Sequence, residues 1–173
     1  YAKRRGFSDS LLWKFRCGYS YEKKWSRRLL IPSFDIEGNL NFVTGRAIDS
    51  TTFLRYVNES WPKQKIVFNE IDLDFTQPMC LVEGPLDLIK CNKNSTCLLG
   101  SSLTENDYLF YRITKSKTPI CLLLDSDAKE KAMKIAKLLT SYSIDVRVNF
   151  PKVGDIGDCS KEQVEHLIKN SVN

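Results

Sequence analysis

Acidic residues follow two short apolar runs in this sequence, at the points where the runs end. Glu83 comes directly after "MCLV", and Asp125 and Asp127 follow "PICLLL". Carboxylates are costly to place beside an apolar core, so this position calls for a function or a compensating charge. Residues two apart in extended or loop backbone point the same way, so Asp125 and Asp127 should present both carboxylates to one place.

Three further acids extend the set. Asp155 and Asp158 follow a later apolar run, and Asp87 comes four residues after Glu83. Carboxylates this dense would raise one another's pKa values unless a cation lay among them. Mg²⁺ suits such a site, because it takes oxygen ligands and keeps several waters while bridging substrate phosphates.

Helix capping is the competing interpretation for individual acids. Asp87 could be a first-turn acid favoured by the helix dipole, and Asp127 could cap a helix that begins at Ala128. For any single acid, capping is the simpler explanation. For Glu83, Asp125 and Asp127 together, at corresponding strand ends, we prefer the metal interpretation.

The elements that must position these acids alternate from residue 77 onward. Strands are expected at 79–83, 95–99, 119–125 and 145–150, and helices near 85–92, 103–113, 128–142 and 160–170. This alternation predicts an α/β fold with a mainly parallel sheet flanked by helices. In such a sheet the ligand crevice lies beyond the carboxyl ends of the strands, where the acids would meet.

The first part of the chain differs in charge and pattern. Residues 1–30 hold nine lysines and arginines against two acids, a local charge of +7, whereas the whole chain carries +5. Aromatic residues are interleaved with these cations, which suits phosphate backbone and stacked bases. A solvated basic face over a small aromatic core explains the pattern equally well.

Local signals outline a smaller α+β lobe in this basic part. Ser8 and Gly18 bracket a short predicted helix, and a hairpin is expected around residues 37–39, with Pro32 favouring an edge strand. Residues 49–76 look like a connecting loop. We therefore expect a basic N-terminal lobe at 1–72 and a metal-binding domain with a C-terminal helix at 73–173.

Other classes of protein are disfavoured by composition. The six cysteines include no C-x-x-C pair and His166 is the sole histidine, so buried reduced thiols are expected rather than a zinc site. No stretch of eighteen apolar residues and no apolar signal core occurs, which predicts a cytoplasmic protein without a membrane partner. Because the chain starts at Tyr1 without a methionine, we interpret it as a fragment.

Two groups of motifs carry a family resemblance. "EGPLD" and the later "DSD" resemble the TOPRIM signature, an acidic site of bacterial-type primases, topoisomerases and related nucleases. "KRRGFSDSLLWKFRCGYS", "RLLIPSFDIEGNLNFVTGRAID", "RYVN" and "LLGSSLT" then follow the order seen in the catalytic core of bacterial and bacteriophage DNA primases. The resemblance covers essentially the whole chain. The compact spacing of these motifs and the "EGPLD" sequence are more similar to phage enzymes than to cellular ones.

The resemblance implies a DNA-directed RNA polymerase core that joins ribonucleotides into primers on single-stranded DNA. Mg²⁺ would be the cofactor, with Mn²⁺ as a substitute ion and no zinc in this fragment. Glu83, Asp125 and Asp127 would hold the metal and serve catalysis. Asp87, Asp155 and Asp158 would be further ligands or organisers of the site.

The resemblance also implies contacts to template or nucleotide phosphates. Arg5, Arg46 and Arg55 match basic positions of the family, and Lys65 is the nearest substitute for a further one. Tyr56 and Asn58 are assigned to local packing or turn hydrogen bonding. Implied partners are a single-stranded DNA template, ribonucleoside triphosphates and a replicative helicase bound through regions absent here; a phage enzyme would act in the host-cell cytoplasm.

Two alternatives remain open at this point. A TOPRIM nuclease would use the same acids to activate water for phosphodiester hydrolysis. A catalytically weak DNA-binding TOPRIM module would keep the fold without turnover.

Overall fold

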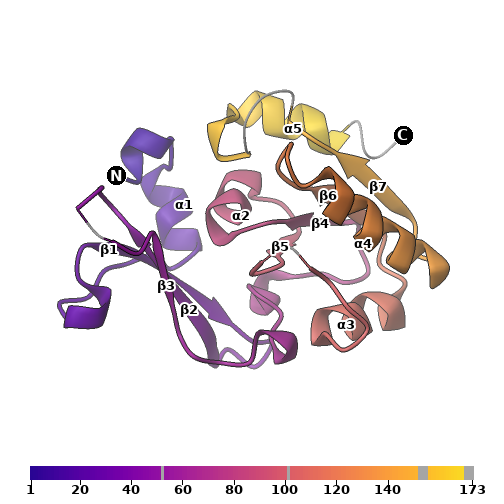
Figure 1. Cartoon of the computed structure of the whole chain (residues 1–173), viewed down its shortest axis with the longest axis horizontal. Coiled ribbons are helices and arrows are strands. Elements are labelled where there is room, and N and C mark those ends of the chain that lie inside the picture. Colours follow the sequence, from indigo (N-terminus) through magenta and orange to yellow (C-terminus); the bar gives the residue numbers. More distant parts are fainter. Residues whose placement is uncertain (52, 101, 152–155, 170–173) are drawn as a thin grey trace.

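Two separate sheets organise the molecule, as Figure 1 shows. The computed structural model describes residues 1–51, 53–100, 102–151 and 156–169 of the chain. The first sheet is antiparallel with the order β1-β2-β3, and the second is parallel with the order β5-β4-β6-β7. The mixed α/β class and the parallel sheet expected from the sequence are thereby confirmed.

The antiparallel sheet belongs to the basic part of the chain. Its strands are β1 (Arg28–Phe34), β2 (Leu40–Ala47) and β3 (Tyr56–Asn58). The helical segments around it are η1 (Lys3–Arg5), α1 (Asp9–Lys14), η2 (Lys23–Trp25), η3 (Lys63–Lys65) and η4 (Glu70–Asp72).

Local sequence explains most of this lobe. The Ser8 side chain caps α1 by accepting from the Leu11 N–H at 3.2 Å. Gly38 turns the hairpin with a φ of 86°, where a side chain would be strained, and Asp35 accepts from the Asn39 N–H at 2.8 Å. Strand β1 lies at the sheet edge, as its proline predicted; only an isolated bridge between Gly18 and Leu30 extends beyond it.

The expectation of an unbroken loop at 49–76 was wrong. β3 pairs there with β2, and η3 and η4 follow it. The strand is three residues long and exposed at both ends, so it shows none of the apolar alternation by which strands are predicted. Its pairing depends on β2, which local sequence cannot reveal.

The parallel sheet carries the second half of the chain. Its strands are β4 (Met79–Val82), β5 (Ser95–Cys97), β6 (Ile120–Leu123) and β7 (Val146–Asn149). Its helical elements are α2 (Pro85–Cys91), α3 (Tyr108–Ser116), α4 (Lys129–Ser141), η5 (Ile156–Asp158) and α5 (Lys161–Lys169).

Each face of this sheet has its own apolar core. Met79 and Leu81 of β4 pack with side chains from α3 and α4, whereas Cys80 and Val82 pack with side chains from α2 and α5. The four β4 residues are all buried, which is typical of a strand covered on both faces.

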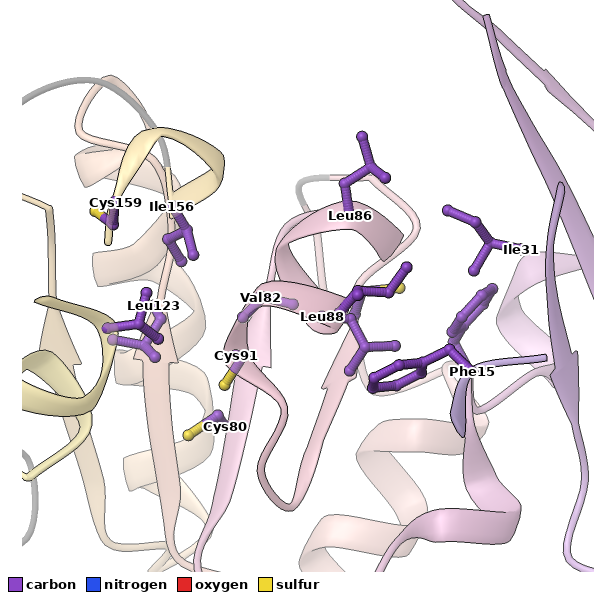
Figure 2. Close-up of a cluster of buried hydrophobic side chains, with 14 of the residues drawn as sticks. Phe15, Ile31, Cys80, Val82, Leu86, Leu88, Cys91, Leu123, Ile156 and Cys159 are labelled. Carbon is purple, nitrogen blue, oxygen red and sulfur yellow. The ribbon is translucent and has the colours of Figure 1, made fainter. Parts of the chain in front are cut away.

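Helix α2 lies between the two sheets. Figure 2 shows Leu88 of α2 close to Phe15 and Ile31 of the basic lobe, with Val82 of β4 on its other side. Leu88, Ile31 and Val82 are fully buried in one cluster. A single core therefore crosses the expected boundary at residues 72 and 73 and packs the two lobes together.

The remaining expectations concern thiols and membranes. All six cysteines are free in the structure, and every one except Cys17 is buried. His166 is exposed on α5. Within the described ranges, no helix is both long and apolar enough to cross a bilayer.

Candidate nucleotide and metal site

A cavity of about 360 Å³ lies where the antiparallel sheet faces the carboxyl ends of β4 and β6. One part of its wall comes from β2, β3 and the N-terminal segment, and the other from α2 and the segments that follow the parallel strands. The lining residues are Arg5, Thr44, Arg46, Arg55, Tyr56, Asn58, Glu83, Gly84, Pro85, Leu86, Asp87, Leu99, Gly100 and Asp125. Residues from both expected lobes thus meet in one place.

One wall of the cavity is acidic. Glu83 follows β4 and Asp125 follows β6, and these neighbouring strands end in register with Val82 opposite Leu123. Parallel pairing brings their carboxyl ends to the same edge of the sheet. The structure therefore places Glu83 and Asp125 on the same cavity, where the sequence predicted a shared site.

Asp87 has a structural role beside this wall. Its Oδ2 accepts a hydrogen bond from the Gly84 N–H at 3.1 Å, and the Leu88 N–H donates to the Gly84 carbonyl at 3.1 Å. With Pro85 in the first turn, these contacts begin α2 directly after Glu83. The capping alternative therefore holds for Asp87, which also lines the cavity.

A turn separates Asp127 from Asp125. Ser126 and Asp127 form this turn, closed by the Ala128 N–H donating to the Asp125 carbonyl at 2.9 Å. A turn rotates successive side chains, so the two-residue repeat of extended backbone does not apply. Asp127 is exposed and is not among the cavity-lining residues, so its place beside Asp125 in a metal site stays a prediction.

Two of the other predicted metal ligands are not placed by the structure. Asp155 and the side chain of Asp158 fall outside the residues that the structure describes. In the part of the chain that it does describe, no three histidine, cysteine or acidic side chains are grouped closely enough to hold a metal. Glu83 and Asp125 still fit a Mg²⁺ site of the kind that uses one or two carboxylates and completes its shell with water and substrate phosphate.

The opposite wall is basic. Arg5, Arg46 and Arg55 all line the cavity. Arg46 is 7% exposed, and its guanidinium carbon lies 4.7 Å from the centre of the Tyr56 ring. Its Nε is buried and has no hydrogen-bond partner among the described residues. Such a guanidinium is suited to an anion inside the cavity.

Trp25 and Arg28 pack closely against β2 at Gly45, the residue before Arg46. A Cβ on Gly45 would lie 3.0 Å from both the Trp25 ring and the Arg28 side chain, so glycine permits their close approach. Arg28 donates to the carbonyl oxygens of Gly45 at 3.3 Å and Leu54 at 2.9 Å. Arg28 therefore ties β2 to the segment that carries Arg55.

Three polar side chains in the wall, those of Thr44, Tyr56 and Asn58, were not expected in the site. Thr44 of β2 donates its hydroxyl hydrogen to Oδ1 of Asn58 at 2.6 Å, and Arg46 is in register with Tyr56. Burial raises the pKa of the Tyr56 hydroxyl, partly opposed by the Arg46 charge, so the hydroxyl stays protonated at neutral pH. Tyr56 and Asn58 lie close to Arg55 in the sequence, which was the signal that could have indicated them. Placing them and Thr44 in the cavity required the pairing of β2 with β3.

Lys65 does not reach the cavity. It is exposed at the end of η3. Lys63, at the start of the same turn, donates to the Leu99 carbonyl at 2.9 Å, and Leu99 lines the cavity. Lys63 therefore supports the wall from outside.

Sequence comparison finds one relevant relative. No family model matches the chain. The DNA primase of Mycoplasma pneumoniae is 28% identical over 133 residues, which are 70% of this chain and 22% of that protein. The chain thus spans about a fifth of the length of this curated relative.

Solved structures share the fold over nearly the whole chain. The Aquifex aeolicus primase, solved with its zinc-binding and RNA polymerase domains, has a TM-score of 0.78 at 22% identity and covers 99% of this chain and 55% of its own. The RNA polymerase domain of Mycobacterium tuberculosis primase DnaG gives 0.74 at 16% identity, with 98% and 74% covered. A DnaG primase catalytic domain bound to ssDNA gives 0.77 at 16% identity, with 99% and 72% covered.

Proposed function

We propose that this chain, whose fold is that of the DnaG-type primase catalytic core, is the RNA polymerase core of a DNA primase. The observation that carries the proposal is a single cavity with three arginines and three carboxylates on its walls. A nucleoside triphosphate with a divalent cation has the complementary pattern, because its phosphates bind guanidinium groups and its cation binds carboxylates. The product would be short RNA primers made in DNA replication.

The arginines would bind the triphosphate. Arg46 presents a largely buried guanidinium that Tyr56 holds by stacking, and Arg5 and Arg55 add charge from the same side. Planar guanidinium groups match phosphate oxygens in pairs and so orient the nucleotide. This orientation would leave the α-phosphate turned toward the acidic wall.

Glu83 and Asp125 would hold Mg²⁺ at that wall, with Asp127, Asp155 and Asp158 as further candidates. When bound, Mg²⁺ would neutralise charge that develops on the phosphates during transfer. The 3′-hydroxyl of one ribonucleotide would attack the α-phosphate of the next, forming a phosphodiester bond and releasing pyrophosphate. No protein nucleophile is required, so positioning and electrostatic stabilisation would account for catalysis.

The template would be single-stranded DNA, as in the DnaG catalytic domain solved with ssDNA. The high positive charge of residues 1–30 suits a phosphate backbone. A replicative helicase would be contacted through parts of a longer protein, and the site of action would be the cytoplasm, or that of the host for a phage enzyme. Primer synthesis by the 173 residues alone is expected to be weak.

The test uses single-stranded DNA, Mg²⁺ and labelled ribonucleotides. The chain should produce short labelled RNA, and Glu83→Gln should remove this product without weakening DNA binding, because it removes a charge that only the metal requires. Glu130→Gln is the matched control, since Glu130 is exposed in the first turn of α4 and does not line the cavity.

Three results would contradict the proposal. Shortened DNA without RNA would favour a TOPRIM nuclease. Binding without any product would favour a catalytically weak DNA-binding module. Equal RNA yields from Glu83→Gln and Glu130→Gln would overturn the metal assignment.

The basic wall is tested separately. Arg46→Ala and Arg5→Ala should each weaken binding to single-stranded DNA or nucleotide, with a smaller loss at high salt because phosphate contacts are screened. Fluorescence anisotropy at several salt concentrations measures this. Unchanged binding by both variants would remove these arginines from the site.

A further inference from the structure

A second and larger cavity lies at the amino ends of the parallel strands, at the other end of the sheet from Glu83 and Asp125. Its volume is about 480 Å³, against about 360 Å³ for the cavity with the carboxylates. Its wall comes from the starts of β4, β6 and β7, the segment before β5, and one residue of α5. Because parallel strands run from this edge to the other, the cavity is separated from Glu83 and Asp125 by the length of the sheet.

The floor of this cavity is mainly apolar. Met79 and Ile120 begin the neighbouring strands β4 and β6, but their side chains pack on the α3 and α4 face and are 0% and 2% exposed, so they offer little surface to a ligand. Pro78 and Pro119 precede them, and Ile168 of α5 closes one side. A concave apolar surface of this volume is typical of sites that enclose small organic molecules.

Arg147 supplies the polar feature. It lies in register with Cys121, which lies in register with Cys80, so the three side chains share one face of the sheet. The Nη1 of Arg147 is buried and has no hydrogen-bond partner in the described part of the chain. A buried guanidinium N–H without an acceptor costs free energy that a ligand acceptor would recover.

Charges around the opening favour an anion. Of the described residues that line the cavity, Lys93 and Arg147 are basic and Asp145 is acidic. Asp145 forms no ion pair with Arg147 within 4.0 Å, so the guanidinium is not neutralised by its neighbour. An anion that contacts Arg147 would also be desolvated by the apolar wall, which strengthens the contact.

The thiols in the wall do not compete for this role. Hydrogen bonds with Cys121 and Cys91, together with burial, raise the pKa of Cys80. The thiol therefore stays neutral and unreactive at neutral pH. Cys80 therefore contributes apolar surface to the cavity and acts neither as an anion nor as a nucleophile.

We propose that this cavity binds a small organic anion with an apolar body, such as an aromatic carboxylate or sulfonate. Arg147 would contact the anionic group, Lys93 would add positive charge from the β5 end of the cavity, and Pro78, Pro119 and Ile168 would enclose the body. One buried guanidinium in a concave apolar wall suits a single anionic group better than a nucleic-acid backbone, which needs a long basic track. The site is independent of the proposed primase activity.

The test uses the whole 173-residue chain with 2-naphthoate as the probe. Its neutral isostere 2-naphthamide and acetate are the matched ligands, because each keeps only one of the two recognised features. In ¹H–¹⁵N NMR titrations, 2-naphthoate should saturate and shift the signals of Gln77, Lys93 and Asn94. Both matched ligands should bind at least about tenfold more weakly, as expected for loss of a charged hydrogen bond or of apolar contact.

Variants identify the guanidinium as the cause. Arg147→Met should weaken 2-naphthoate binding about tenfold and 2-naphthamide binding much less, because a hydrogen bond from the guanidinium to a carboxylate is stronger than one to an amide oxygen. Arg27→Met is the control, since Arg27 is exposed in the other lobe and pairs with Asp49. If Arg147→Met does not fold, Arg147→Gln and the shift map of the unaltered chain provide the same decision.

The outcomes divide clearly. Saturable, charge-dependent binding mapped to the starts of β4, β5 and β6 supports the proposal. Equal affinity for naphthoate and naphthamide, shifts centred on Arg46 or Glu83, or no saturable shift at all would each overturn it.

Discussion

At the scale of single residues, the pairing of Arg46 with Tyr56 shapes the basic wall. The two side chains stack at 4.7 Å across the β2–β3 pair, where they are in register. Stacking restricts the guanidinium, and the buried Nε–H has no partner among the described residues, so this donor remains available to an anion. Tyr56 thereby pre-orients a phosphate ligand that it need not touch.

This arrangement predicts different results for two Tyr56 variants. Tyr56→Leu removes the ring and should weaken nucleotide binding about fivefold, in line with about 1 kcal/mol for such a contact. Tyr56→Phe keeps the ring and should bind nearly as the unaltered chain does. Titration of a fluorescent nucleoside triphosphate measures both, and an equal loss in the two variants would show that the hydroxyl matters instead.

Residue positions differed in how far sequence could place them. Glu83 and Asp125 were predicted at a common edge because each ends an apolar run, and both line one cavity. Asp127 does not line that cavity, because it lies in a turn, where the two-residue spacing of extended backbone does not hold. Tyr56 was missed because its neighbour Arg46 is ten residues away and meets it only through strand pairing.

At the scale of elements, an ion pair joins η4 to α3. Arg112 pairs with Glu70, which is 3% exposed, and its guanidinium carbon lies 4.3 Å from the centre of the Phe75 ring. Removing one member of a buried pair leaves an uncompensated charge. The pair therefore holds η4, in the segment that connects the two sheets, against helix α3.

Arg112→Met should be strongly destabilising. We expect a loss of about 2–3 kcal/mol in the free energy of unfolding, below the range for fully buried pairs because Arg112 keeps some exposure. The double variant Glu70→Gln with Arg112→Met should recover much of this loss, since no buried charge remains. Urea unfolding monitored by circular dichroism measures both; an equally unstable double variant would contradict the argument.

The same variant has a defined pH dependence. Burial raises the pKa of Glu70, and the charge of Arg112 opposes this shift. Without Arg112, the folded-state pKa moves further above the unfolded one, so the folded state takes up its proton first as the pH falls. The deficit of Arg112→Met should therefore shrink as the pH falls from neutral toward the ordinary pKa of a glutamate side chain. A deficit that grows on acidification would contradict the sign.

Element prediction succeeded where patterns are local. Continuous apolar runs and capped helices predicted the parallel sheet, and Ser160 with Gln163 caps α5 as expected. The short strand β3 escaped prediction because it has no periodic apolar face of its own. Its existence depends on β2, and with it the basic wall of the site.

At the scale of the whole molecule, α2 joins the two sheets. Leu88 lies between them, in the cluster that Figure 2 shows, and both Leu88 and Ile89 are fully buried in that cluster. The acidic wall begins at the N-terminus of this helix, and the basic wall lies on the sheet against which it packs. One core therefore sets the distance across the cavity.

Leu88→Ala tests this shared core. It should lower the free energy of unfolding by about 3 kcal/mol, because it opens a cavity at a fully buried site. Fluorescence and circular dichroism should still report one coincident transition, as expected if both sheets unfold together. Two separate transitions in the unaltered chain would show that the lobes are independent.

The relation between the sheets was beyond sequence reasoning. Each lobe could be outlined from its own pattern, and the resemblance named the residues that should meet. The cavity itself depends on contacts between residues such as Phe15 and Leu88, which are far apart in the chain. No local periodicity encodes such packing.

The central claim is that the two walls of this cavity bind one nucleotide and its cation. The most direct measurement is a crystal structure of the chain with Mn²⁺ and a non-hydrolysable nucleoside triphosphate, in which anomalous scattering locates the ion. We expect manganese coordinated by Glu83 or Asp125 and phosphates against Arg46 and Arg5. An ion bound by neither carboxylate, or a triphosphate outside this cavity, would contradict the account.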